Sequence, residues 1–407
     1  MRWIADFHLH SKYSGGCSPL MEPEHLAAWG AKKGLNLLGT GDFTHPIYLA
    51  RLKEIMEPAE PGLLRLKSTP RDSDASPFVR FVLSSEMGLF FKQDDQWRKI
   101  HLIIVAPSFD IVDRINAAVQ RYGDLAEDGR PKLFLSLTDC IDLVRGISEG
   151  CWLIPAHIWS PWFSLFGAFS GFDSLEEALG KNVTAIDAVE TGLSSDPAMN
   201  RRVSALDHLP LISNSDAHSL PKLGREANVL EAEADLSALR AAIKSQDPNR
   251  FLYTIEFYPE EGKYHYDGHR GCGVSLPPEE TERLKRRCPV CGKRLTIGVM
   301  HRVEDLADRP EQGLPPPRIP ARYLVPLIEI IAEAMGRRVE AKGVTQTYDR
   351  LIAAGKNEFR ILRDAPPEEL ATFVPPDILK GILRMRAGEV IKIPGYDGIF
   401  GKIQLLK

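Results

Sequence analysis

The chain lacks the features that would place it in a membrane or in an oxidising compartment. No uninterrupted apolar segment is long enough to cross a bilayer, and no basic N-terminal region leads into an apolar stretch. The six cysteines are too few and too unevenly spaced for a secreted disulfide framework. Internal repeats and low-complexity tracts are also missing. We therefore expect a cytoplasmic globular protein with reduced thiols and no membrane partner.

The composition also lacks a strong excess of either charge. The net charge is −4 over 407 residues, with 43% hydrophobic and 26% charged residues. These values are ordinary for a soluble protein, and the length suits two or three domains. Overall acidity does not exclude a nucleic acid as partner, because counterion release depends on local cationic contacts.

Six short apolar runs each contain or closely precede a residue that can bind a metal. The runs are 3–5, 35–39, 78–83, 100–105, 152–154 and 209–212, and they read as buried strands. In a barrel of alternating parallel strands and helices, the carboxyl ends of the strands meet on one face. The sequence therefore predicts a polynuclear metal centre there, built from His8, His10, Asp42, His45, Glu86, His101, His157, Asp216 and His218.

The residue types in this set indicate the chemistry. His8 and His10 are two residues apart on one strand, so their imidazoles share a face, and Asp216 and His218 repeat that spacing. The Glu86 carboxylate can bridge two ions. Imidazole with carboxylate suits zinc, manganese or iron, with magnesium as a further candidate. Two or three such ions can activate water against a phosphoester, and we assign catalytic roles to Glu86, Asp216 and His218. An amidohydrolase would be expected to place a lysine at a strand end, and this set contains none.

Residues 1–257 alternate predicted strands and helices, with helices expected at 22–33, 136–146 and 236–245. Ser136 or Thr138 would cap the second of these helices. Two insertions interrupt the pattern, at 57–77 and in the aromatic stretch 159–172. The aromatic stretch forms either a satellite core under a lid or a surface on which bases stack.

A second metal site is predicted in a module at 258–300. His269 and Cys272 are separated by two residues, as are Cys288 and Cys291, and fifteen residues lie between the two pairs. Two such pairs suit one tetrahedral structural zinc in a small ribbon-like module. His265 is a competing first ligand, and we prefer His269 because its spacing to Cys272 matches the other pair.

A basic run overlaps this module, and it is either a solvated face or a patch that binds phosphates. We predict that it contacts DNA phosphates through Arg283, Lys285, Arg286, Arg287, Lys293 and Arg294.

The third region, 301–407, is predicted to be mainly helical. A proline-rich linker at 310–320 leads into expected helices at 324–335, 348–354, 368–373 and 378–386. A hairpin with Asp397 and Gly398 at its turn is expected at 391–403.

The ordered motifs of the first region resemble the PHP (polymerase and histidinol phosphatase) family. They comprise His8-Leu9-His10, Asp42, Glu86, His101, Pro155-Ala156-His157 and Ser215-Asp216-Ala217-His218. The resemblance implies an α/β fold with a distorted (β/α)7 barrel and up to three metals. One departure is that Thr40-Gly41-Asp42 stands where Thr-Asp-His is common, with His45 three residues on. Asp42, His45 or both are therefore candidate ligands. Cys17, near another ligand position of some relatives, is interpreted as structural.

Later segments extend the resemblance to the endonuclease Q family over nearly the whole chain. They are Tyr264-His265-Tyr266-Asp267-Gly268-His269-Arg270, the Cys288–Cys291 pair, 301–306 and 394–398. The resemblance implies a monomeric DNA repair endonuclease that cuts on the 5′ side of uracil, hypoxanthine, xanthine or an abasic site. The partner would be double-stranded or single-stranded DNA carrying a lesion, with other repair or replication factors as further candidates.

Two other functions compete with this one. A small-molecule phosphatase of the histidinol phosphatase kind would need the barrel alone. A binding protein with an inactive barrel is disfavoured by the intact ligand set.

Overall fold

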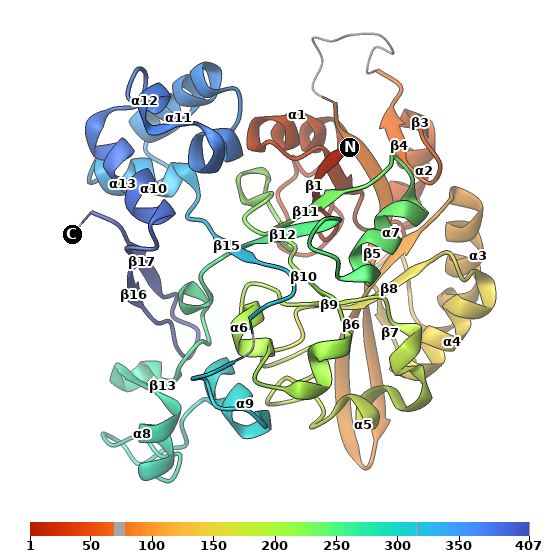
Figure 1. The fold of residues 1–407 in the computed structure, drawn as a ribbon. Helices are drawn as coiled ribbons and strands as arrows, with labels where there is room; N and C mark the ends of the chain where they lie inside the picture. Colours follow the sequence, from red (N-terminus) through yellow and green to blue (C-terminus); the bar gives the residue numbers. More distant parts are fainter. Residues whose placement is uncertain (69–77, 315, 407) are drawn as a thin grey trace.

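The computed structural model describes residues 1–68, 78–314 and 316–406 (Figure 1). The part of the predicted insertion at 69–77 lies outside the described residues. Strands of the first region are β1 (Arg2–Asp6), β2 (Leu37–Gly39), β3 (Met56–Pro58), β4 (Leu64–Leu66), β5 (Arg80–Gln93), β6 (Gln96–Ala106), β7 (Lys132–Leu133), β8 (Trp152–Pro155), β9 (Val189–Glu190), β10 (Leu211–Ile212), β11 (Ala227–Glu231) and β12 (Phe251–Glu256). Its helices are α1 (Pro23–Lys33), α2 (Pro46–Ile55), α3 (Phe109–Val119), α4 (Leu137–Ile147), α5 (Leu175–Leu179), α6 (Pro197–Asn200) and α7 (Leu236–Ser245).

The strands form a mixed sheet in an α/β fold. β1, β2 and β5 are parallel, as alternating strands and helices require, whereas β11 runs antiparallel to β1 and β12 antiparallel to β11. β9 and β10 form a separate parallel pair. The carboxyl ends of β1, β2 and β10 therefore open toward one face, which is where the predicted ligands follow them.

The expected helices form where the capping residues predict. α1, α4 and α7 correspond to the predicted segments. The Ser136 hydroxyl accepts a hydrogen bond from the Asp139 N–H, so Ser136 caps α4 and Thr138 does not. Asp235 caps α7 in the same way through the Ala238 N–H.

The strand alternation is broken at β5 and β6, which form one long antiparallel hairpin. The sequence predicted two separate strands of a parallel barrel at these positions. Asp94 and Asp95, both with positive φ, make the tight turn, and Gln93 pairs with Gln96 across it. Left-handed conformation at both central residues matches the twist of a two-residue hairpin. Glu86 and His101 consequently lie on neighbouring antiparallel strands.

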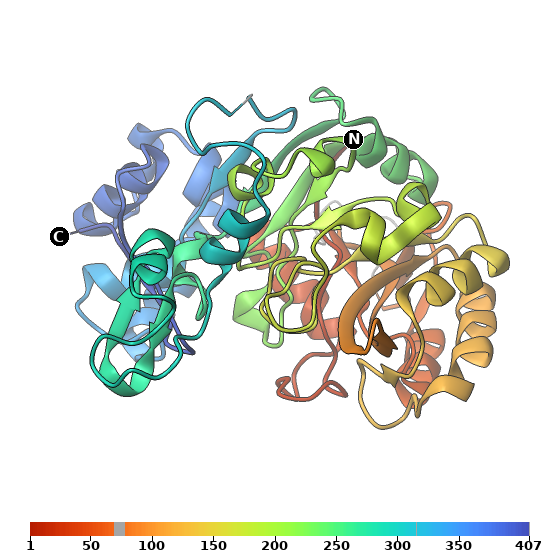
Figure 2. The same ribbon diagram turned by 90° about the horizontal axis from the view of Figure 1, so that it is seen from below.

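The later elements lie to one side of the first region in both views (Figures 1 and 2). The small module contains β13 (Asp267–His269), β14 (Val274–Leu276), α8 (Pro278–Arg283) and α9 (Val299–Leu306), and the linker ends in β15 (Ala321–Tyr323), which pairs with β12. The last region contains α10 (Leu327–Ala334), α11 (Lys342–Gly355), α12 (Pro367–Leu370), α13 (Pro376–Arg386), β16 (Ile391–Ile393) and β17 (Lys402–Gln404). β16 and β17 form the predicted hairpin, with positive φ at Asp397 and Gly398.

A continuous apolar core runs from the barrel strands into the helices of the last region. Trp3, Phe7 and Trp152 fill a second cluster of fully buried side chains. None of the helices in the described ranges has the length and apolarity needed to span a membrane.

Candidate metal centre

The two histidines that follow β1 lie against the residue that follows β10. Nε2 of His10 lies 3.1 Å from Oδ1 of Asp216, and Nε2 of His8 lies 3.7 Å from the same oxygen. These three atoms are buried and have no hydrogen-bond partner among the described residues. Buried polar atoms without partners are rare and need an explanation, which a bound cation would give.

Glu86 on β5 occupies the centre of the cluster. Its Oε1 lies 2.8 Å from Nδ1 of His101 and 3.0 Å from Nε2 of His157. Its two oxygens also approach Nε2 of His8 and His10, at 3.5 and 3.4 Å. One carboxylate therefore touches four imidazoles, which is the arrangement expected of a bridging ligand.

Two groups in this cluster have the geometry of metal sites. Ligand atoms of His8, His10 and Asp216 all lie within 4.8 Å of one another, and so do those of Glu86, His101 and His157. Imidazole nitrogen with carboxylate oxygen fits divalent zinc, manganese or iron. The structure therefore brings together six of the nine predicted ligands.

The carboxylates of the site are held in the charged form. Burial alone would raise the pKa of Glu86, but His101, His8 and Arg130 hold it well below its usual value. The pKa of Asp216 is likewise lowered, because His8 and His10 outweigh the effect of burial. Buried carboxylates that stay ionised need compensating positive charge, which the neighbouring imidazoles and Arg130 supply.

Asp42 lies behind His10. Its Oδ1 is 3.0 Å from Nδ1 of His10, and its other oxygen accepts hydrogen bonds from the Ser11 N–H and the Ser11 and Ser14 hydroxyls. This contact directs Nε2 of His10 toward Asp216, as carboxylates behind metal-bound histidines do. His45 stacks on Tyr13, with ring centroids 4.3 Å apart. Among the described residues, neither Asp42 nor His45 belongs to a group with metal-site geometry.

Glu190 at the end of β9 orients the imidazole of His8, as Asp42 orients that of His10. It was not among the residues predicted from the sequence. Its carboxylate oxygens lie 3.0 and 3.1 Å from Nδ1 of His8. It also accepts hydrogen bonds from the His157 N–H and the Asn214 amide, and its side chain is fully buried. The sequence does carry a signal for Glu190, which is an acidic residue at the end of a short apolar strand. The other candidate ligands were predicted from the same pattern.

His218 lies at the edge of the centre. Its ring centroid is 4.6 Å from that of His10, and its Nδ1 is 2.9 Å from the backbone oxygen of Asp216. Its ring nitrogens belong to neither group with metal-site geometry. The side chain is about one-third exposed, at 33%.

The centre opens into a cavity of about 490 Å³ that carries four cationic side chains. The Arg130 guanidinium donates a hydrogen bond of 3.2 Å to Oε2 of Glu86, and Arg225 lies beside Phe257. Lys132 and Lys263 line the same cavity. These cations occupy loops or strand ends without a recognisable motif, so the sequence alone did not single them out.

The aromatic stretch 159–172 divides between a buried and an exposed half. Trp159, Phe166 and Phe172 are fully buried and belong to the main apolar core rather than to a separate satellite core. Trp162 is 37% exposed and stacks on Phe169 with centroids 4.8 Å apart at 11°. Trp162 and Phe163 line the cavity beside Tyr264 and Phe400. The stacking of bases on this surface stays a prediction.

The second predicted metal site is also assembled. Ligand atoms of His269, Cys272, Cys288 and Cys291 lie within 4.8 Å of one another, and Nδ1 of His269 is 3.6 Å from the Cys291 sulfur. Burial would raise the pKa of Cys288, but backbone N–H groups of Cys291 and Val290 lower it to about 7. His265 is buried elsewhere and stacks on Tyr266. The four residues fit a tetrahedral zinc, whereas His265 does not join them.

The basic run is less free of acidic partners than its sequence indicates. Arg283 pairs with Glu280 at 2.9 Å, and Arg286 pairs with Glu282 at 2.6 Å and with Asp305 at 3.2 Å. Glu280 and Glu282 reach these arginines because helix spacing brings residues three and four positions apart into contact, whereas Asp305 comes from α9. Within the described ranges, exposed cations of the run that form no ion pair are Lys285, Arg287, Lys293 and Arg294.

Comparison with known proteins places these features in one family. The family described as MJ0043 C-terminal domain matches residues 326–389. The uncharacterized protein YqxK of Bacillus subtilis is 30% identical, with 98% of each chain covered. The structure of the lesion-specific endonuclease PfuEndoQ from Pyrococcus furiosus matches with a TM-score of 0.87 and 30% identity, over 100% of this chain and 96% of that one. A structure of Endonuclease Q in complex with a 27-mer duplex carrying an abasic lesion at the active site matches with a TM-score of 0.86 and 31% identity, over 100% and 98%. With its full length matched and its ligand residues assembled, the chain belongs to the endonuclease Q family.

Proposed function

We propose that the chain is a DNA repair endonuclease that hydrolyses the phosphodiester 5′ to a deaminated base or an abasic site. The observation that carries the proposal is one cavity lined by His101, His157 and Asp216 of the metal centre, by four cationic side chains and by several aromatic rings. The match to an endonuclease bound to an abasic duplex extends over this whole chain, including the modules outside the barrel.

The proposed metal ligands are those of the two groups, completed by the residues at their edges. His8, His10 and Asp216 would hold one divalent ion, and Glu86 with His101 and His157 another. His218 is a candidate for a third, while Asp42 and Glu190 orient imidazoles. Ions held there would supply Lewis-acid activation of water and charge neutralisation at the phosphate. We propose zinc, manganese, iron or magnesium for this centre.

The side chains around the centre would bind and orient the scissile phosphate. Arg130 and Arg225 are the partly buried cations of the cavity, and guanidinium groups match phosphate geometry with two parallel hydrogen bonds. Asp216 is kept ionised by its neighbours and can accept a proton from an attacking water. The proposed roles are thus phosphate binding for the arginines and ligation or proton transfer for Asp216.

The exposed aromatic side chains would hold a base that leaves the helix. Enzymes that act at a damaged nucleotide extrude it and read it in a pocket, where aromatic faces stack on it. Trp162, Phe163, Tyr264 and Phe400 come from three separate segments and line one cavity. This arrangement would grip a nucleotide from the barrel side and from the C-terminal hairpin together.

The parts outside the barrel would hold the polymer. We propose three units, a phosphoesterase domain at 1–257, a module with one structural zinc at 258–300 and a mainly helical domain at 301–407. Lys285, Arg287, Lys293 and Arg294, the cations of the basic run that form no ion pair within the described ranges, would contact DNA phosphates. The competing function, a phosphatase for small molecules, would not require the zinc module and the helical domain.

The test uses end-labelled duplexes that differ at one nucleotide: uracil, hypoxanthine, xanthine, an abasic site or no lesion. The expected result is a metal-dependent nick on the 5′ side of each lesion and none in the undamaged duplex. Histidinol phosphate is included as a competing substrate. Hydrolysis of the small phosphate without nicking of any duplex would overturn the proposal in favour of the phosphatase.

A further inference from the structure

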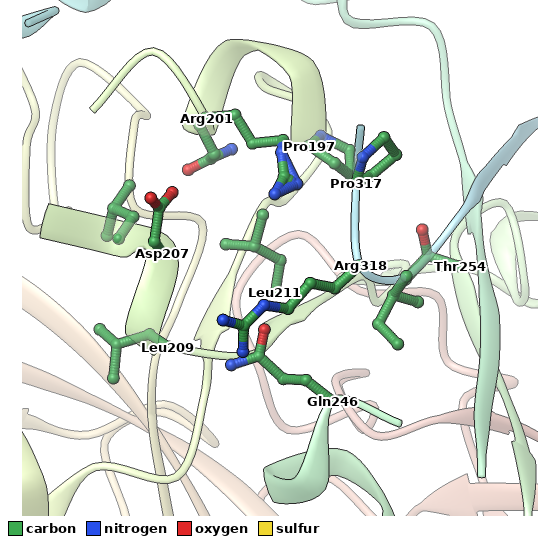
Figure 3. A pocket seen from close by; sticks show the side chains of 12 residues that line it. Pro197, Arg201, Asp207, Leu209, Leu211, Gln246, Thr254, Pro317 and Arg318 are labelled. Atoms are coloured by element: carbon green, nitrogen blue, oxygen red, sulfur yellow. The ribbon is translucent and has the colours of Figure 1, made fainter. Parts of the chain in front are cut away.

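A second cavity lies away from the metal centre, between α6, the short helix η3 (Ser204–His208), the end of α7 and the segment that precedes β15 (Figure 3). Its enclosed volume is about 30 Å³, and it widens to about 460 Å³ when the open mouth is included. None of its lining residues lines the metal cavity. A ligand bound here would therefore not occupy the site proposed for the scissile phosphate.

Two guanidinium groups project into this cavity without a carboxylate to neutralise them. Arg201 and Arg318 approach it from opposite walls (Figure 3), and neither forms an ion pair within the described ranges. The carboxylate nearest to them, Asp207, is occupied by the Arg309 guanidinium, whose two nitrogens donate to its oxygens at 2.9 and 2.6 Å. The cavity therefore carries an uncompensated positive charge.

Of the two arginines, Arg201 is the one whose positive charge is less well compensated. Its Nε is buried and has no acceptor among the described residues. Burial lowers the pKa of Arg201, and the charges of Arg309 and Arg318 lower it further, against the opposing effect of Asp207. A guanidinium that is partly desolvated and surrounded by like charges is stabilised by an anion.

The remaining walls select among anions. Leu206, Leu209 and Leu211 form an apolar floor, and Ile319 with two prolines closes the side near the linker. The Gln246 amide lies beside the Arg318 guanidinium at the mouth (Figure 3). The enclosed part holds only a few heavy atoms, so the rest of a ligand would lie in the open mouth. An apolar floor disfavours a fully hydrated dianion. A carboxylate attached to a short aliphatic group satisfies both the cations and the floor.

We propose that this cavity binds an aliphatic carboxylate, with the carboxylate between Arg201 and Arg318 and the aliphatic group on the three leucines. The same chemistry is offered by a free branched-chain acid and by the C-terminus of a protein chain that ends in leucine. Binding at this place adds a site to the chain that is independent of the nuclease centre.

The experiment is calorimetric titration of the full chain with 4-methylpentanoate, with a short peptide that ends in leucine, and with the same peptide amidated at its C-terminus. The expected result is binding of at least one of the two carboxylates and none of the amidated peptide. Tighter binding of the peptide assigns the site to a protein C-terminus, and tighter binding of the acid assigns it to a metabolite.

Variants connect the binding to the cavity. Arg201→Gln and Arg318→Gln should each weaken it at least about tenfold, since a charge-assisted hydrogen bond is lost. Arg338→Gln, at an exposed arginine that lines neither cavity, should leave it unchanged. Arg318 is exposed in a loop, so its variant tests the site even if Arg201→Gln does not fold. Nicking activity should be unaffected by all three substitutions.

Three results would overturn the inference: no binding of either carboxylate, binding that survives both substitutions, or inorganic phosphate bound as tightly as 4-methylpentanoate. The last result would mean that the arginines attract any anion and the apolar floor selects nothing. Because the metal centre is not involved, a failure here leaves the proposed nuclease function untouched.

Discussion

Glu190→Gln is the substitution with the most sharply defined consequence at the metal centre. Oε1 of Glu190 accepts hydrogen bonds from Nδ1 of His8 at 3.0 Å and from the Asn214 amide at 2.9 Å. Oε2 accepts from the His157 N–H at 2.8 Å and lies 3.1 Å from the same His8 nitrogen. Every neighbour is a donor, so neither position offers a partner for an amide NH2 group.

The substitution leaves a conflict in either amide orientation. The NH2 group replaces one carboxylate oxygen and then faces a donor, either the His157 N–H or the Asn214 amide, while the amide oxygen remains beside Nδ1 of His8. A neutral amide oxygen is a weaker acceptor than a carboxylate, so Nε2 of His8 is less firmly directed at Asp216 and Glu86. An unsatisfied buried donor costs about 1–3 kcal/mol, which corresponds to about tenfold to hundredfold weaker metal binding, and loss of such an orienting partner has a similar effect.

The assay is the initial rate of nicking of a duplex with one abasic site, measured over a series of manganese concentrations. We expect the concentration for half-maximal rate to rise about tenfold to hundredfold, with partial recovery of the rate at saturating metal. An unchanged rate and an unchanged metal dependence would refute the assignment of Glu190 as the residue that orients His8.

Glu226→Gln is the matched control. Burial and the neighbouring Glu256 raise the pKa of Glu226 well above its usual value, which favours the uncharged acid that an amide resembles. Like Glu190 it is fully buried, but no hydrogen bond joins it to His8 or His10 in the described structure. We expect wild-type metal dependence in this variant.

The other predictions concern the catalytic aspartate, the zinc module and the basic run. Asp216→Asn should lower the nicking rate at least about hundredfold with little loss of DNA affinity in a binding assay, and a smaller loss of rate would contradict a direct role. Cys288→Ser and His269→Ala should each remove one zinc per chain by metal counting and destabilise the module, whereas His265→Ala should retain the zinc. Lys285→Ala/Lys293→Ala should weaken binding to damaged and intact duplexes alike and flatten the salt dependence by a slope of about 1 to 2. An unaltered slope would mean that these lysines only solvate the surface.

The spacing of the candidate ligand pairs predicted which residues lie close together, because such spacing directly encodes geometry. Residues two apart on a strand share a face, so His8 and His10 could be placed together from their spacing alone. The same holds for the zinc module, where two short ligand pairs need only a tight turn each. The parts of the centre that could be predicted are those in which a short spacing along the chain fixes the direction of the side chains.

The residues that were missed depend on contacts between distant segments. Glu190 meets His8 across 182 positions, and Arg130 meets Glu86 across 44. The long β5–β6 hairpin was missed for a different reason, because an Asp94-Asp95 turn lacks the glycine that normally marks such a connection. The basic run was misjudged at Arg286, whose acidic partners lie outside the run.

Backbone conformation gives independent support for the position of the site. Asp42, His157 and Asp216 have φ of 47°, 29° and 46°, in the left-handed region that costs a residue with a Cβ about 1 kcal/mol or more. Gly192 leaves the room that His157 needs, since an added Cβ there would lie 2.5 Å from the His157 Cβ. A chain selected only for stability would place glycine or asparagine at such positions. Here the positions carry charged or imidazole side chains, on three segments that meet at one cluster. A binding role of these side chains explains the choice of residues better than a contribution of the backbone to folding.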